Sequence, residues 1–202
     1  MWKYPLAILI GYLAGCFSTA DTVGRFRHVN IHKIGTGNPG ASNVTFILGW
    51  RMGLLVGFVD IVKGILATFL TIVISHGNLF LGLLAGSACI LGHMFPFYLK
   101  FKGGKGFATL VGVLFGFDWK FALLAVLFIF LITLTTDYIV LSTLTTTVLF
   151  PLRAYLRTSS LLAIWIVLPV VLIMFYKHRT NLYRIFVARC GEKGFSLLFR
   201  KE

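Results

Sequence analysis

Long apolar segments occupy most of this 202-residue chain and constrain its fold more than any other feature. A transmembrane α-helix needs roughly 20 mainly apolar residues, because the hydrocarbon core of a bilayer is about 30 Å thick. The fourth segment, residues 107–117, is about half that length and could join the fifth, residues 121–136. The Gly, Asp and Lys residues at positions 116, 118 and 120 between them indicate a turn. The sequence therefore predicts an all-α integral membrane protein with seven transmembrane helices, and six is the alternative. The apolar segments are residues 5–23, 52–74, 79–98, 107–117, 121–136, 138–156 and 160–176.

The overall composition leaves little room for a separate water-soluble domain. Hydrophobic residues make up 58% of the chain and charged residues only 12%. The mean hydropathy of +0.91 is well above that of chains with a water-facing surface. We therefore expect residues 1–202 to form a single transmembrane domain.

The distribution of positive charge predicts how the chain is oriented in the membrane. With seven crossings, fourteen of the 19 Lys and Arg residues fall on one side: four near or between the ends of the first and second segments, three between the third and fourth, and seven from Lys177 onward. Cytoplasmic loops are the ones enriched in Lys and Arg. The sequence thus predicts an external amino terminus and a cytoplasmic carboxyl terminus. This explanation of the net charge of +13 leaves no need for a nucleic-acid partner.

The cysteines give no sign of a disulfide framework or a metal centre. Cys16, Cys89 and Cys190 are odd in number, and the first two lie in apolar segments without metal-ligand spacing. We expect reduced packing residues, no metal and no cofactor.

The first loop, residues 35–43, contains three glycines, two hydroxyls and two amides. Glycine tolerates the positive φ values that turn successive backbone N–H groups toward one point, which suits a phosphate. An ordinary tight turn before a helix capped by Ser42 or Asn43 is the alternative. The candidate anion-binding residues are Thr36, Gly37, Asn38, Gly40, Ser42 and Asn43.

The second loop, residues 100–106, precedes the short fourth segment, so a positive helix end is expected to face it. Its lysines are equally typical of positive-inside anchoring. The glycines lack the four-residue spacer and the following Ser or Thr of a nucleotide-binding P-loop. The candidate anion-binding residues here are Gly103, Gly104, Lys105 and Gly106.

Ionisable residues also occur inside or at the end of apolar segments. Asp60 and Lys63 are three residues apart, hence on one helix face, where they neutralise each other or support a phosphate site. The last segment ends in His178-Arg179-Thr180-Asn181; if the helix continues, His178 and Asn181 share a face. His178 is a candidate base or phosphate donor, and a basic collar is the alternative for Arg179. We expect His93 to be a packing histidine.

Five strings, in order and separated by apolar spans, resemble the bacterial acyl-phosphate:glycerol-3-phosphate acyltransferase family: GTGNPGASN, DIVKG, GHMFP, FKGGKG and HRTN. The resemblance implies a multi-pass protein of the bacterial inner membrane with its active site on the cytoplasmic side. It implies acyl phosphate and glycerol 3-phosphate as substrates, lysophosphatidic acid as product, the lipid bilayer as surroundings and no obligate protein partner.

The same resemblance implies roles for individual residues. The first loop and Lys105 are expected to bind acyl phosphate, and His178 and Asn181 to bind glycerol 3-phosphate. Where the family usually carries an Arg after the first motif, this chain has Phe46, and whether Arg51 replaces it stays open. Further substrate-binding or polar-support candidates are Asp60, Lys63, Ser142 and Arg179, with Ser142 standing in for a family serine two residues earlier.

The implied reaction is attack of the sn-1 hydroxyl on the acyl carbonyl with release of phosphate. The proton acceptor is His178 or the acyl phosphate itself, and the lack of an Asp or Glu beside the histidine favours the second. A membrane transporter of organic phosphate is the principal rival, but the spans are nearly free of ionisable residues and show no inverted repeat. A structural subunit would leave the glycine-rich loops unexplained.

Overall fold

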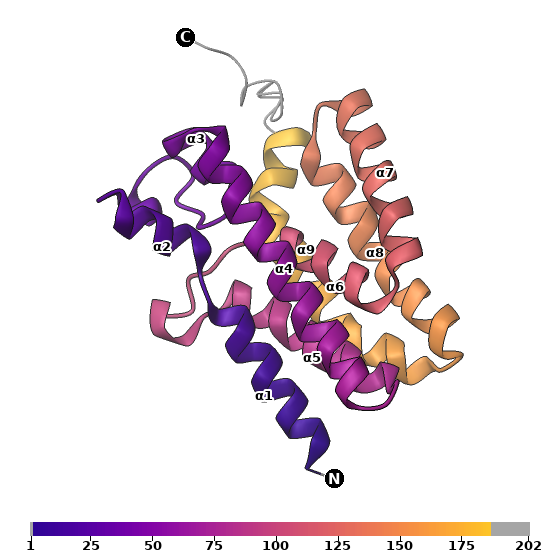
Figure 1. The fold of residues 1–202 in the computed structure, drawn as a ribbon. Helices are drawn as coiled ribbons and strands as arrows, with labels where there is room; N and C mark the ends of the chain where they lie inside the picture. Colours follow the sequence, from indigo (N-terminus) through magenta and orange to yellow (C-terminus); the bar gives the residue numbers. More distant parts are fainter. Residues whose placement is uncertain (1, 187–202) are drawn as a thin grey trace. The chain divides into compact units, whose positions relative to one another are not determined.

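The structure is a computed structural model that describes residues 2–186, and no strand occurs in that range. Helices account for all of its regular structure, so the predicted all-helical fold is confirmed for the described residues (Figure 1). The chain forms two compact units, one comprising Met1–Trp119 and the other beginning at Lys120. The expectation of one domain over residues 1–202 remains a prediction.

The first unit contains six α-helices and two short 3-10 helices, and the second contains three long α-helices. The first-unit elements are α1 (Lys3–Cys16), α2 (Thr19–Phe26), η1 (Ile31–Lys33), α3 (Ala41–Leu48), α4 (Trp50–Ile74), α5 (Leu79–Met94), η2 (Phe97–Leu99) and α6 (Phe107–Phe117). The second-unit helices are α7 (Trp119–Thr136), α8 (Ile139–Thr158) and α9 (Leu161–Phe186).

Six helical segments in the described residues are long and apolar enough to cross a membrane. They are Lys3–Phe26, Trp50–Ile74, Leu79–Leu99, Trp119–Thr136, Ile139–Thr158 and Leu161–Tyr183. The remaining predicted segment, the fourth in chain order, is α6, whose 11 residues rise only about 16 Å, roughly half the thickness of the hydrocarbon core. A turn separates α6 from α7 at Asp118, as the polar residues there predicted.

Small residues let α1 pack directly on the backbone of α5. A side chain at Gly11 would collide with the backbone of Ala85, and one at Gly15 with that of Cys89. On α5, a side chain at Gly92 would collide with the backbone of α1. Because lipid tails are as apolar as leucine, close van der Waals packing of this kind holds membrane helices together. Gly64 of α4 and Gly112 of α6 make an equivalent close approach.

The first predicted segment, residues 5–23, is interrupted where one continuous helix was expected. Helix α1 ends at Cys16, and Ser18 begins α2 as its N-cap by accepting a hydrogen bond from the Asp21 N–H at 3.3 Å. The interruption releases backbone groups that a continuous helix would have paired. Tyr98 meets two of them: its hydroxyl accepts from the Ser18 N–H at 3.1 Å and donates to the Cys16 carbonyl at 2.9 Å.

A small apolar core supports the first loop from within the first unit. Buried side chains from α2, η1, α3 and α4 form this loop core, so the short elements α2, η1 and α3 have a packing role. Asn30 caps η1 by accepting from the His32 N–H at 3.1 Å. The loop core consists of Ala20, Val23, Ile31, Val44 and Val56.

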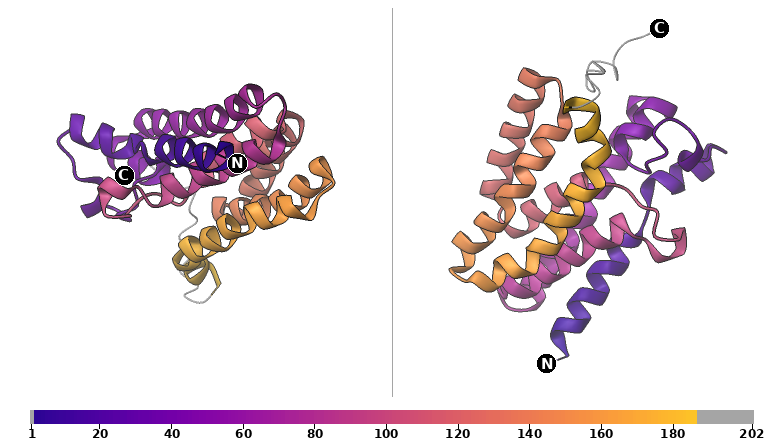
Figure 2. Two further views of the ribbon diagram at one scale, coloured as in Figure 1. Left: turned by 90° about the horizontal axis from the view of Figure 1, so that it is seen from below. Right: turned by 180° about the vertical axis from the view of Figure 1, so that it is seen from behind.

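In the second unit, α8 and α9 lie side by side (Figure 2). Thr147 of α8 donates a hydrogen bond to the Met174 sulfur of α9 at 3.9 Å. The hydroxyls of Thr133 on α7 and Ser142 on α8 are 3.2 Å apart, and Ser142 also donates to the Ile139 carbonyl at 2.8 Å. Hydroxyls that bond across helices or to the preceding turn keep their polar atoms satisfied in an apolar environment.

Candidate active site

The first loop has the backbone geometry that its glycines predicted. Gly35 and Gly37 have φ values of +62° and +67°, in the left-handed region that favours glycine. The Gly37 N–H donates to the Ile34 carbonyl at 3.1 Å, which closes a tight turn. Helix α3 then begins with Gly40 as its N-cap, so no cap side chain covers its first N–H groups.

Asn43 holds the first loop together from inside. Its side chain is 3% exposed, and its Oδ1 accepts from the Thr36 N–H at 2.8 Å. Its Nδ2 donates to the carbonyls of Ile31 at 3.3 Å and Ile34 at 3.2 Å. The amide therefore joins Ile31 of η1 to Ile34 and Thr36 of the glycine turn. This internal role was not predicted, and a direct contact of Asn43 with substrate stays a prediction.

Replacing Asn43 by aspartate is expected to destabilise the protein, because Oδ1 is kept while both donations are lost and a carboxylate is left facing two carbonyl oxygens. Each unsatisfied buried group costs about 1–3 kcal/mol. We expect a clear drop in the thermal unfolding midpoint of the purified protein in detergent. Asn38→Asp makes the same chemical change at a partly exposed position of the loop and is the control; equal midpoints for the two variants would contradict this role of Asn43.

Two residues near the first loop, Phe46 and Arg51, bear on the arginine that the family resemblance implies after the first motif. The Phe46 side chain is 71% exposed, and its ring lies 3.3 Å from where a Cβ on Gly35 would be. The Arg51 guanidinium lies over the Trp50 ring, 5.5 Å from the ring centroid. The position after the first motif is thus apolar and touches the loop.

The second loop is pinned to the end of α5. The Gly103 N–H donates to the Met94 carbonyl and the Gly104 N–H to the His93 carbonyl, both at 3.1 Å. Side chains at Gly103 and Gly104 would collide with His93. Gly106, with a φ of +88°, is the N-cap of α6, so this helix also begins without a cap side chain. Lys105, between these glycines, is partly exposed.

The two loops meet in the first unit, as the sequence predicted. A Cβ on Gly104 would lie 3.1 Å from the Pro39 carbonyl oxygen of the first loop. Each loop leads directly into a helix N-terminus, α3 or α6. Backbone N–H groups at helix starts, together with the lysine of the second loop, form the kind of site that binds phosphate.

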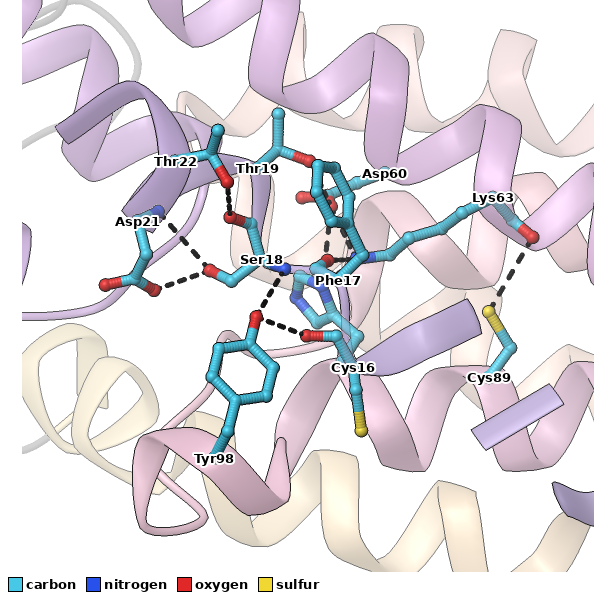
Figure 3. Close-up of polar contacts among 11 residues, drawn as sticks. Cys16, Phe17, Ser18, Thr19, Asp21, Thr22, Asp60, Lys63, Cys89 and Tyr98 are labelled. Carbon is cyan, nitrogen blue, oxygen red and sulfur yellow. Dashed lines mark hydrogen bonds and ion pairs between the residues drawn. The ribbon is translucent and has the colours of Figure 1, made fainter. Parts of the chain in front are cut away.

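A buried charge pair on α4 contacts His93, the same residue whose carbonyl accepts the Gly104 N–H of the second loop. Lys63 Nζ is 2.7 Å from Asp60 Oδ1, and the two side chains are 8% and 3% exposed. Lys63 also donates to the Phe17 carbonyl, which the interruption between α1 and α2 releases, and contacts His93 Nδ1, both at 2.9 Å. Thr19 donates to Asp60 Oδ1 at 3.4 Å (Figure 3). The pair is therefore a polar support that joins α1, α2, α4 and α5.

A polar side-chain contact joins α2 to η1. His32 Nε2 lies 2.9 Å from Asp21 Oδ1, while Ser18 donates to Asp21 Oδ2 at 2.5 Å. No role was predicted for His32. The spacing of Ser18 and Asp21, a serine three residues before an acid, is a helix-capping signal from which the start of α2 could have been predicted.

The residues predicted on the last span lie in the second unit. Helix α9 runs to Phe186, so His178 and Asn181 share a helix face as expected. His178 Nδ1 lies 2.9 Å from the Met174 carbonyl, which only an N–H can approach, so Nε2 carries the lone pair in the neutral ring. The Arg179 guanidinium lies over the Tyr176 ring at 3.9 Å, and Arg179 donates to the Tyr176 carbonyl at 2.9 Å.

Metal binding has no structural support in residues 2–186, where no group of three or more His, Cys, Asp or Glu side chains could hold an ion.

The long apolar helices define a polytopic membrane protein. Its two meeting glycine loops and the polar end of its last span are typical of a protein that binds phosphate groups. The family model described as glycerol-3-phosphate acyltransferase matches residues 5–188. The chain belongs to that family.

Individual relatives agree with this membership. A glycerol-3-phosphate acyltransferase of Oceanobacillus iheyensis is 36% identical over 90% of this chain and 91% of its own length. The enzyme of Aquifex aeolicus is 30% identical over 93% of this chain and 97% of its own length. The predicted acyltransferase that acts on glycerol 3-phosphate is thereby confirmed.

Solved structures confirm the class of fold. The glycerol 3-phosphate form of PlsY (YgiH), an integral membrane glycerol 3-phosphate acyltransferase, has a TM-score of 0.84 at 30% identity and covers 92% of this chain and 93% of its own. Its lysophosphatidic acid form has a TM-score of 0.81 over the same shares. The chain is therefore a multi-pass membrane protein.

Proposed function

We propose that this acyltransferase takes its acyl group from an acyl phosphate and transfers it to the sn-1 hydroxyl of glycerol 3-phosphate. The products are 1-acylglycerol 3-phosphate, that is lysophosphatidic acid, and inorganic phosphate. The observation that carries the choice of donor is the meeting of two glycine loops at Gly104 and Pro39, each leading into an uncapped helix start. Both substrates bring a phosphate, which accounts for a site rich in N–H donors.

The chemistry needs no protein nucleophile. The sn-1 oxygen attacks the carbonyl carbon, a new ester C–O bond forms, the anhydride C–O bond breaks, and phosphate leaves with the electron pair. The proton of the hydroxyl passes to an oxygen of the departing phosphate, in keeping with the absence of an acid beside His178 in the sequence. Positioning the hydroxyl and stabilising charge on the leaving phosphate can each supply several kcal/mol.

The proposal assigns the substrates to separate groups of residues. The acyl-phosphate group binds the two loops; the glycerol 3-phosphate binds His178 and Asn181, whose shared helix face supports this assignment. Asp60, Lys63, Ser142 and Arg179 give polar support. The acyl-phosphate residues are Thr36, Gly37, Asn38, Gly40, Ser42, Asn43, Gly103, Gly104, Lys105 and Gly106.

The proposed membrane arrangement has seven crossings, of which the short fourth one is α6, with an external amino terminus and a cytoplasmic carboxyl terminus. The excess of Lys and Arg on one side supports it. The active site then lies on the cytoplasmic side of a bacterial inner membrane. The acyl chain reaches the site from the bilayer, so no obligate protein partner is needed to deliver it.

The test uses purified protein in detergent with palmitoyl phosphate and glycerol 3-phosphate. We expect lysophosphatidate by mass spectrometry without any added partner. Lys105→Met is expected to raise the KM for palmitoyl phosphate about tenfold or more, because one charged hydrogen bond to phosphate is lost. Lys102→Met, an exposed lysine of the same loop, is the control and is expected to stay near wild type.

Two outcomes would overturn the proposal. Turnover with an acyl thioester but none with palmitoyl phosphate would show a different donor. Flux of glycerol 3-phosphate into vesicles without any acylated product would instead indicate a transporter of organic phosphate.

A further inference from the structure

The His93 ring lies between the buried charge pair and the second loop. Its Nδ1 is 2.9 Å from Lys63 Nζ and 3.5 Å from Asp60 Oδ1. Its Nε2 faces the opposite way, so close to Gly104 that a Cβ there would collide with it. The residue is 9% exposed, and its backbone carbonyl accepts the Gly104 N–H. His93 therefore contacts the loop through both its ring and its backbone.

The hydrogen-bond donors of Lys63 decide which nitrogen of His93 carries the proton. A lysine ammonium has three N–H groups and no acceptor. Lys63 Nζ has three acceptors within 2.9 Å: Asp60 Oδ1, the Phe17 carbonyl and His93 Nδ1. Nδ1 can accept only if it is unprotonated, so the ring N–H is on Nε2. Asp60 Oδ1 lies farther from Nδ1, at 3.5 Å, and is itself contacted by Lys63 at 2.7 Å.

The contact between the two loops depends on this ring. A Cβ on Gly104 would lie against both His93 Nε2 and the Pro39 carbonyl oxygen, so the ring and the first loop meet the same side of this glycine. A rotated or shifted ring would displace Gly104, where the second loop meets the first.

We propose that His93 is a positioning residue: the Lys63–Asp60 pair fixes the orientation of its ring with the N–H on Nε2, and the ring, with the His93 carbonyl, holds the second loop in its phosphate-binding shape. The inference rests on the proposed function and adds to it. It also revises the expectation of a simple packing histidine, since the ring connects a buried ion pair to the loop that binds the donor substrate.

Two amide substitutions separate the two sides of the ring. Asn places its amide near Nδ1, so His93→Asn keeps an acceptor for Lys63 but leaves no group at the position of Nε2 beside Gly104. Gln places its amide nitrogen near Nε2, so His93→Gln keeps a group beside Gly104 but leaves Lys63 one acceptor short. We expect His93→Asn to raise the KM for palmitoyl phosphate about tenfold, with the KM for glycerol 3-phosphate and the unfolding midpoint little changed.

The glutamine variant is expected to show the reverse: a KM for palmitoyl phosphate near that of wild type and a lowered unfolding midpoint. His28→Asn changes an exposed histidine with a φ of +54°, which asparagine tolerates, and serves as the control. If His93 only fills space, both variants lose stability and neither changes one KM selectively; that result would overturn the inference.

A spectroscopic test does not depend on turnover. In protein labelled with 15N-histidine, the His93 signals, identified by their loss in His93→Asn, are expected to show a protonated Nε2 and an unprotonated Nδ1. Lys63→Met should remove this preference. A protonated Nδ1 in the wild type would overturn the inference even if the enzyme uses acyl phosphate. Correct protonation in a protein that does not use acyl phosphate would overturn the proposed donor instead.

Discussion

Replacing Asp60 by asparagine is expected to lower the stability of the protein by about 3–5 kcal/mol, because the substitution leaves the Lys63 ammonium buried without its counter-charge. Asparagine has nearly the same shape as aspartate, so packing is unchanged and only the charge is removed. For a chain of this size, such a loss corresponds to a decrease of the order of 10 °C in the unfolding midpoint. Tryptophan fluorescence of the purified protein in detergent during heating measures it.

The double variant Asp60→Asn with Lys63→Met provides the matched control. It removes both charges, and a buried site without any charge avoids the cost of an unpaired one. We expect it to unfold at a higher temperature than the Asp60→Asn variant, so the two effects are not additive. A double variant as unstable as the sum of the two single variants would contradict the pairing. Lys33→Met, at an exposed lysine, should leave the midpoint unchanged.

Replacing His178 by asparagine is expected to reduce kcat/KM for glycerol 3-phosphate by about a hundredfold or more, the size of effect seen when a positioned polar group near a reacting centre is lost. The asparagine amide can still donate to the Met174 carbonyl, as Nδ1 does at 2.9 Å. Only the group corresponding to Nε2 is removed. Steady-state assays that vary glycerol 3-phosphate at saturating palmitoyl phosphate measure the change.

The control for this variant is Thr180→Ala, an exposed residue on the same turn of α9, which we expect to retain wild-type kinetics. The unfolding midpoint of His178→Asn should match that of the wild type, because the hydrogen bond to the helix backbone is kept. Activity close to wild type in His178→Asn would remove this residue from the substrate site.

The long helices and both glycine loops could be predicted from sequence because each depends on local patterns. Apolar length indicated the spans, and Gly35 and Gly37 adopt the positive φ values for which only glycine is well suited. The start of α2 was missed although Ser18 and Asp21 carry a capping signal, because the apolar run continues through Phe17 and hides the interruption.

The internal contacts of the site could not be predicted, because they join positions far apart in the chain. An asparagine after a glycine turn can bind a ligand or the backbone, and nothing in the spacing shows that Asn43 donates to Ile31 and Ile34. His93 reaches Lys63 across 30 positions of sequence, through the packing of α4 with α5. Contacts of this kind follow from tertiary structure alone.

The loop core beneath the first glycine turn has a consequence for affinity. Val44 and Val56 are fully buried there, so the turn takes its shape when the protein folds. A loop that stayed disordered until substrate arrived would lose conformational entropy on binding and weaken the complex. Here that entropy is lost before any ligand is present, and tight capture of a small dianion does not need a large contact area.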